Sequence, residues 1–364
     1  MNTSTTRFRS LSALWVSMLC AAATIAAEEP AKPAADDPKV VRGPHETPPN
    51  ADPAWVREHD PDFLVQGEYA GEHGTDGGKR KLGAQVAALG DGRFHVVAFE
   101  GGLPGAGFDP ENGKRLGPEL VERKASGAVE GTTDAGKRIA IRDGKLTATS
   151  ADGKQIAVLE RVVRKSKTLG AKPPEGAGVL FDGSNADAWK PIGAKPALTS
   201  DGLLLRGTTS LPEFQSVKIH IEFRTPWEPK GRGQGRGNSG VYVQGRYEVQ
   251  VLDSFAEKPE PGNCGGMYSI AAPAVNMCYP PLEWQTYDID FTAAEFETVD
   301  GKPKRVRDAR MSVLHNGVRI HDDVAIGRER TTAAPEGESP KPGPLFLQDH
   351  GHWVVYQNVW VVAK

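Results

Sequence analysis

Beyond about residue 55, apolar and polar residues alternate with a period of two, in short runs separated by turn-forming pairs. This alternation predicts β-strands with one buried face, and long helical patterns are scarce. The pairs Asp143-Gly144 and Asn316-Gly317 each stand between two such runs. They predict tight hairpin turns, because these residues tolerate a positive φ. We therefore expect an all-β protein, with about eight antiparallel strands in its second half forming a two-sheet jelly roll.

The sequence predicts five segments. Arg7 and Arg9 precede an apolar run that ends in small residues at 21–27, which is typical of a signal peptide over residues 1–27. We therefore expect export to the periplasm or the extracellular space, with no membrane span. Residues 28–54 are rich in Pro, Ala and charge, and predict a disordered linker. The remaining segments are an accessory β-rich domain at 55–168, a linker at 165–178, and the jelly-roll domain at 178–364.

Composition narrows the function. The chain of 364 residues contains 42 Gly and 28 Pro, which suits a turn-rich β protein, and its net charge of −3 includes no basic block. We therefore expect no nucleic-acid partner. The glycine-rich stretch at 101–109 lacks the features of a phosphate-binding loop. Once the signal peptide is removed, Cys264 and Cys278 remain, and the sequence leaves open whether they form a disulfide or two buried thiols.

One stretch, GNSGVYVQGRYEVQVLDSF, carries unusual polar side chains. The residues in one register of this stretch are Tyr242, Gln244, Arg246, Glu248 and Gln250. Along a strand, successive members of such a register lie about 7 Å apart on one face. A merely solvated face is usually rich in Lys, Thr and Ser. We therefore expect this polar face to be the concave wall of a binding groove, with Arg246 and Glu248 projecting into it together.

Six blocks, in this order, resemble the 3-keto-disaccharide hydrolase domain family. They are VLFDGSNADAW, GNSGVYVQGRYEVQVLDS, NCGGMYSIAAPAVN, PPLEWQTYDIDFTA, ARMSVLHNGV and GPLFLQDHG followed by VVYQNVWV. The resemblance covers about 178–364. It implies a concanavalin-A-like sandwich in an exported bacterial protein that cleaves glycosides oxidised to a ketone at C3. PLEWQ replaces the commoner PGEWQ, and GMYS stands where AIYG is frequent, which affects substrate fit more than fold. The region around GEYAG is similar to an N-terminal extension of some members.

A 3-keto sugar needs little catalytic machinery. The ketone acidifies the C2 proton, so one base, one donor to the enolate oxygen and one acid for the leaving group are sufficient for an elimination, after which water adds. We assign these roles to Glu248, Arg246 and His350 respectively. The alternatives are a structural Glu248–Arg246 pair and a loop histidine. A conventional retaining glucanase is disfavoured, because Gln250 stands where a second carboxylate is needed.

Further residues are expected to bind the substrate, with Tyr242 and Trp284 as stacking platforms. The expected binding residues are Asn238, Tyr242, Gln244, Gln250, Asp253, Trp284 and Gln348. No cofactor is predicted, although the spacing of His350 and His352 leaves a divalent metal open. The expected partner is a carbohydrate that an upstream sugar 3-oxidoreductase has oxidised. The alternative function is a non-catalytic, lectin-like carbohydrate-binding protein, since one fold serves both.

Overall fold

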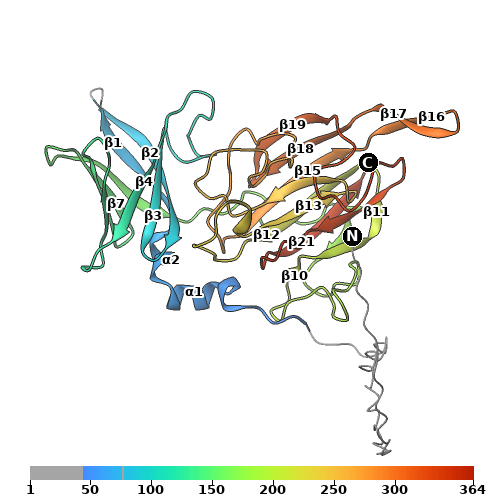
Figure 1. The fold of residues 1–364 in the computed structure, drawn as a ribbon, viewed down its shortest axis with the longest axis horizontal. Coiled ribbons are helices and arrows are strands. Elements are labelled where there is room, and N and C mark those ends of the chain that lie inside the picture. The colour runs from blue at the N-terminus through green and yellow to red at the C-terminus, as the bar shows by residue number, and fades with distance from the viewer. Residues whose placement is uncertain (1–43, 76–77) are drawn as a thin grey trace, which may run out of the picture. The chain divides into compact units, whose positions relative to one another are not determined.

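The computed structural model describes residues 44–75 and 78–364, which belong to one compact unit. The expected signal peptide at 1–27 and residues 28–43 of the expected linker lie outside the described residues. Strands dominate the described chain, as predicted (Figure 1). They form an eight-stranded barrel followed by two sheets that pack face to face.

The barrel is antiparallel throughout and closes by pairing of β1 with β8. Its strands are β1 (Gly67–Thr75), β2 (Gly78–Gly90), β3 (Arg93–Glu100), β4 (Arg115–Arg123), β5 (Val129–Thr132), β6 (Arg138–Arg142), β7 (Lys145–Thr149) and β8 (Gln155–Val162). The predicted hairpin turn at Asp143-Gly144 is confirmed, with φ of 49° and 74°. Alternate residues such as Val86, Phe94 and Leu159 fill the interior, so the barrel is a packed core rather than a pore.

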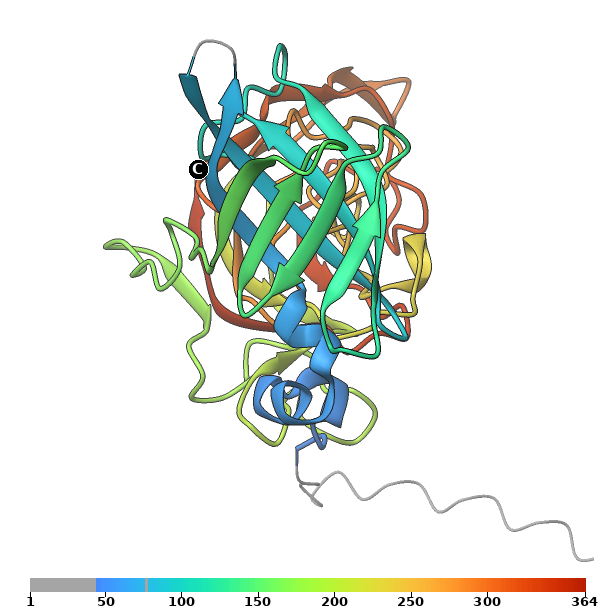
Figure 2. The ribbon, with the colours of Figure 1, turned by 90° about the vertical axis from the view of Figure 1, so that its left-hand side faces the viewer.

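Short helices precede the barrel, and Figure 2 shows them at one end of its strands. They are η1 (Pro49–Ala51), α1 (Pro53–His59) and α2 (Pro61–Val65). The Asp52 side chain caps α1 by accepting hydrogen bonds from the Ala54 and Trp55 amides. Val56 and Phe63 are buried in the barrel core.

The prediction of a disordered linker is wrong for residues 44–54. His45 exchanges backbone hydrogen bonds with Leu198 and Ser200, and the Trp227 amide donates to the Asn50 carbonyl. These contacts satisfy backbone groups that a free tether would leave to water.

The second half of the chain forms a sandwich of two antiparallel sheets, in agreement with the predicted jelly roll. The larger sheet contains β9 (Gly178–Phe181), β10 (Leu204–Leu205), β12 (Val217–Arg224), β15 (Gln285–Thr292), β18 (Ala309–His315), β19 (Val318–Ile326) and β21 (Val355–Ala363). The smaller sheet contains β11 (Thr208–Phe214), β20 (Gly343–Leu347), β13 (Ser239–Val243) and β14 (Tyr247–Val251), in this order. A separate hairpin joins β16 (Glu295–Val299) to β17 (Lys302–Arg307).

The inward faces of the two sheets share one hydrophobic core. Val241 and Val249 from the smaller sheet meet this core, as do Ile221 and Ile289 from the larger one. The alternate residues of β13 and β14 therefore point away from the core, as the period-two pattern predicted. The hairpin turn predicted at Asn316-Gly317 is confirmed, with φ of 53° and 75°.

The segment predicted as a second linker, 165–178, is fixed at its start. The Thr168 hydroxyl donates to Asp288, and the Gly170 amide donates to Glu222, so the segment lies against the larger sheet. Cys264 and Cys278 are free, buried thiols, which is one of the two alternatives that the sequence left open. None of the helices in the described residues has the length and apolar content of a membrane span.

Candidate active site

The polar stretch that the sequence singled out is a hairpin and not one strand. β13 ends at Val243, and the chain turns through Gln244 and Gly245, whose φ values are 56° and 62°. The turn brings Tyr242 directly opposite Glu248, and Gly240 directly opposite Gln250. These four residues therefore share one face of the smaller sheet. The expectation of an unbroken polar row is wrong, because alternation of faces holds only while the strand continues.

Glu248 lies at the centre of this face in a chain of hydrogen bonds. The Tyr242 hydroxyl donates to its carboxylate at 2.7 Å, and the Gln348 side-chain amide donates to the same hydroxyl oxygen at 3.1 Å. Glu248 is only 2% exposed. Burial raises the pKa of the Glu248 carboxyl to about 8, although the hydrogen bond from Tyr242 acts in the opposite direction. A carboxyl group with such a pKa is suited to general acid–base chemistry near neutral pH.

Gly240 provides the space that the Glu248 carboxyl occupies. A Cβ atom on Gly240 would overlap Oε1 of Glu248. The Gln348 backbone amide donates to the Gly240 carbonyl at 3.0 Å. Gly240 is thus flanked by Gln250 on β14 and by Gln348 just after β20, with the carboxyl of Glu248 lying over it. The absence of a side chain here is a requirement of the site.

Arg246 does not accompany Glu248, which corrects the expected groove. Its guanidinium donates to the carbonyls of Gly337 and Lys341, at 2.8 and 3.2 Å, and to the Gln244 side chain at 2.9 Å. Arg246 is 4% exposed. Instead of opening into solvent, this end of the hairpin is covered by the segment 331–341, and Arg246 holds that segment in place.

A cluster of three amide side chains extends the face on the other side of Gly240. The Asn238 side-chain amide donates to the backbone carbonyl of Gln234, and the Gln234 side-chain amide donates to the Gly262 carbonyl. These carbonyls can only accept, so they fix which way both amides point. Oε1 of Gln234 then accepts from Asn238 and from Gln250, each at 3.0 Å.

This arrangement leaves two buried acceptors free. Oδ1 of Asn238 and Oε1 of Gln250 have no hydrogen-bond partner among the described residues. Each such buried acceptor costs about 1–3 kcal/mol unless a donor reaches it. Hydroxyl groups are donors of the right kind, so the cluster is suited to a polyhydroxylated ligand.

The other residues expected at the site lie apart from this cluster. Gln244 is in the turn, where its amide donates to the Phe214 carbonyl. Asp253 forms a buried ion pair with Arg236 at 2.6 Å. Trp284 precedes β15 in the larger sheet, where the Arg224 guanidinium lies 5.0 Å from its ring centre.

His350 is exposed in the loop that follows β20. The strand ends at Leu347, and the Gly351 amide donates to the Asp349 carboxylate in a turn, so the alternation that was expected to align Gln348 with His350 does not continue. The His350 and His352 rings are stacked 6.1 Å apart, and Nδ1 of His352 lies 2.6 Å from Glu228. Within residues 44–75 and 78–364, no three His, Cys, Asp or Glu side chains are grouped as a metal site would require.

Sequence reasoning missed two residues of this site. Gly240 occupies a face position within an otherwise polar register, and a glycine inside a strand is a signal of close approach that was available. Gln234 lies in η2 (Gly233–Gly235), a single irregular turn. Nothing in its sequence context indicates that its side chain joins Asn238 to Gln250.

The second half of the chain is similar to known proteins. Residues 176–362 match the 3-keto-alpha-glucoside-1,2-lyase-like domain, and the barrel lies outside the matched range. A crystal structure of a candidate glycosyl hydrolase from Parabacteroides distasonis is 32% identical, covers 52% of this chain and 85% of its own, and has a TM-score of 0.47. A second candidate glycosyl hydrolase from this organism is 19% identical, covers 56% and 98% of the two chains, and has a TM-score of 0.38. No curated protein matches the chain.

Proposed function

The chain belongs to the 3-keto-alpha-glucoside-1,2-lyase-like family, and from this premise we propose that it cleaves the glycosidic bond of 3-keto glycosides by elimination, with Glu248 as the base. The observation that carries the proposal is the buried Glu248 carboxyl, whose pKa is raised to about 8. A ketone at C3 acidifies the C2 proton, and a carboxylate whose conjugate acid has a pKa near the working pH is suited to act as its general base.

In the proposed reaction, Glu248 takes the proton from C2. The electrons of that C–H bond first form an enolate with the C3 oxygen; the ketone then re-forms, a double bond forms between C1 and C2, and the bond from C1 to the leaving oxygen breaks. The departing oxygen takes the proton that Glu248 holds, which restores the base, and leaves as an alcohol, so the overall change is glycoside to unsaturated keto sugar plus alcohol. Water then adds across the double bond, which completes a net hydrolysis.

The hydrogen-bond chain supports two further roles. Tyr242 holds the Glu248 carboxylate in one orientation over Gly240. The half-buried Gln348 amide uses one N–H for the Tyr242 hydroxyl and has a second N–H to offer. In our proposal this second N–H stabilises the enolate oxygen, the task that the sequence had suggested for Arg246. The free acceptors of Asn238 and Gln250 bind sugar hydroxyls.

Access to Glu248 requires two segments to separate. Segment 331–341 and the chain around Ser269 meet above the face, where the Thr332 hydroxyl lies 3.4 Å from the Ser269 hydroxyl and both residues are exposed. The Thr332 carbonyl oxygen also lies 3.5 Å from the Tyr242 hydroxyl. We propose that the substrate enters where this weak, exposed contact parts, since closure of such segments excludes water from the reaction.

The proposed reaction needs a substrate that is already oxidised, so an upstream sugar 3-oxidoreductase supplies it. Because the N-terminus has the pattern of a signal peptide, we propose that the glycoside is cleaved outside the cytoplasm.

The test compares 3-keto glucosides with the matching unoxidised glucosides, and measures released alcohol. We expect turnover of the keto series alone, and in D₂O we expect deuterium at C2 of the sugar product, because the C2 proton is removed and replaced. Turnover of the unoxidised series alone would overturn the mechanism. Binding of both series without turnover would instead support the lectin-like alternative.

A further inference from the structure

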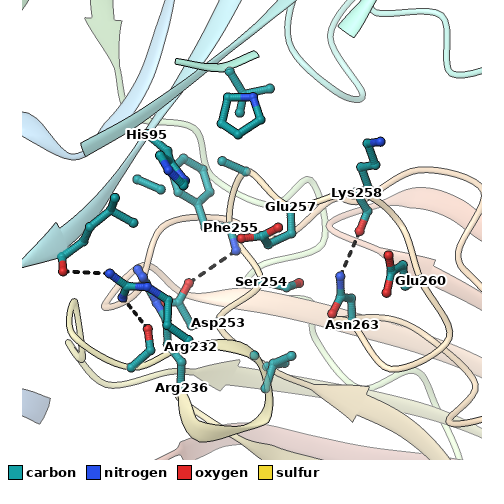
Figure 3. A pocket seen from close by; sticks show the side chains of 18 of the residues that line it. His95, Arg232, Arg236, Asp253, Ser254, Phe255, Glu257, Lys258, Glu260 and Asn263 are labelled. Carbon is teal, nitrogen blue, oxygen red and sulfur yellow. Dashed lines mark hydrogen bonds and ion pairs between the residues drawn. The ribbon is translucent and has the colours of Figure 1, made fainter. Parts of the chain in front are cut away.

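A cavity of about 440 Å³ lies between the barrel and loops of the sandwich. Figure 3 shows His95 on the barrel side facing Phe255 and Glu257, with Arg232, Arg236 and Asp253 beside them. The volume of the cavity falls within the range of small-molecule sites. The barrel is outside the residues that match the family, so this cavity is additional to the family's domain.

Three arginines line this cavity. Each donates a hydrogen bond to a backbone carbonyl on the other side of the boundary between the barrel and the sandwich. Arg115 on β4 donates to the Ala256 carbonyl at 2.7 Å. Arg236 and Arg232 donate in the opposite direction, to the carbonyls of Ala88 and Leu89 at 3.0 and 2.9 Å. The guanidinium groups are therefore held in place before any ligand binds, which lowers the entropic cost of binding.

These bonds do not satisfy the arginines completely. Nη2 of Arg236 and Nε of Arg115 are buried and have no hydrogen-bond partner among the described residues. The Arg236 residue is 6% exposed. The hydrogen bonds between the barrel and the sandwich thus use only some of the N–H groups of Arg115 and Arg236. The remaining N–H groups need an acceptor. A planar carboxylate is the acceptor that best matches a guanidinium group.

The acidic residues of the cavity do not fill this need. Asp253 is used by Nε of Arg236 at 2.6 Å. In the part of the chain that the structure describes, the exposed Glu257 side chain forms no ion pair, although its charge acts on Arg115, Arg232 and His95. Asn263 offers an acceptor at the rim, while Val97 and Phe255 supply an apolar wall. Hydroxyl donors and an apolar ring face would complement these groups.

We propose that this cavity is a binding site for a carboxylate-bearing sugar, such as a uronic acid. Its carboxylate is bound by the guanidinium groups of Arg115 and Arg236. Its hydroxyls donate to the side-chain oxygen of Asn263 at the rim. The site is separate from Glu248, because the short η2 turn stands between them: Gln234 joins the amide cluster, whereas Arg232 and Gly233 line the cavity.

The test is a calorimetric titration of the full chain with D-glucuronate, with D-glucose and acetate as comparison ligands. We expect one saturable glucuronate site per chain and much weaker binding of both comparison ligands. Arg115→Gln should weaken glucuronate binding about tenfold or more. The matched control Arg80→Gln removes one exposed positive charge from β2 of the barrel and should leave the affinity unchanged.

A second variant keeps the proposal testable if Arg115→Gln disturbs folding. Glu257→Gln removes an exposed negative charge near the arginines, and should strengthen glucuronate binding about threefold, because that charge repels the anion. Absence of glucuronate binding, or unchanged affinity in Glu257→Gln, would overturn the proposal. Acetate binding as tightly as glucuronate would overturn the assignment to a sugar.

Discussion

The Tyr242 hydroxyl donates a hydrogen bond of 2.7 Å to the Glu248 carboxylate across the β13–β14 hairpin, and both side chains are shielded from solvent. A buried carboxyl group normally avoids charge. Among the described residues, one neutral donor and no cation act on this carboxyl, so its pKa stays raised at about 8 and it can still ionise. This balance is what a base for a carbon acid needs.

Glu248→Gln should remove turnover of 3-keto glucosides while substrate binding persists. The amide fills nearly the same space over Gly240 but cannot accept the C2 proton, and loss of a general base costs about 10²–10⁴ in rate. Single-turnover kinetics measure the rate, and calorimetry with the keto glucoside measures binding. Retained turnover would show that Glu248 is not the base.

Tyr242→Phe should shift the pH dependence of kcat/KM upward. In the wild type, kcat/KM should rise with pH and level off above about 8, as Glu248 ionises. The hydrogen bond from Tyr242 lowers the pKa of Glu248, so its loss should raise that pKa by about one unit or more. Tyr247→Phe, on the opposite face of the hairpin, is the matched control and should leave the profile in place. An unshifted profile in Tyr242→Phe would contradict the proposed coupling.

Gly240→Ala should reduce activity without unfolding the protein. The new methyl group would displace the Glu248 carboxyl, and a displacement of about 1 Å can cost about a hundredfold in rate. Gly235→Ala is the control, because a Cβ there meets open space. Activity assays and thermal melts measure the two effects, and full activity in Gly240→Ala would mean that the carboxyl does not act from this position.

Arg246→Ala should make the protein less stable to unfolding. Its three hydrogen bonds hold segment 331–341 and the hairpin turn, so its loss should lower the free energy of unfolding by about 3 kcal/mol. Arg310→Ala, which removes an exposed pair with Asp323, should change it by less than about 1 kcal/mol. Denaturant unfolding measures both. If Arg246→Ala were as stable as the wild type but lost turnover, Arg246 would have the enolate role that we propose for Gln348.

A disulfide between segment 331–341 and the chain around Ser269 should block the reaction reversibly. In the double variant Thr332→Cys and Ser269→Cys, oxidation should link the segments where their hydroxyls now lie 3.4 Å apart. We expect the oxidised form to lose turnover and the reduced form to recover it, because the substrate enters between them. The single variants, treated in the same way, are the controls. Full activity of the linked form would place the entrance elsewhere.

The strands, two hairpin turns and the family can be predicted from the sequence, because the patterns that specify them are local. Strand alternation requires only neighbouring residues, and Asp143-Gly144 and Asn316-Gly317 form turns through their own backbone preferences. The family follows from six ordered blocks. The sequence singles out Glu248, because a carboxyl in the polar register of a strand has few structural explanations, and its catalytic role is our proposal.

The tertiary structure alone determined what surrounds Glu248. Gln244-Gly245 is a weaker turn signal than Asn-Gly, and continuing the alternation across it wrongly placed Arg246 on the same face as Glu248. The carbonyls that accept hydrogen bonds from Arg246 belong to Gly337 and Lys341, about ninety residues further along the chain. The arginine cavity likewise combines Arg115 of the barrel with Arg236 of the sandwich. Local patterns determine which face a side chain takes, but only packing of distant segments decides whether that face is open, covered or paired with another charge.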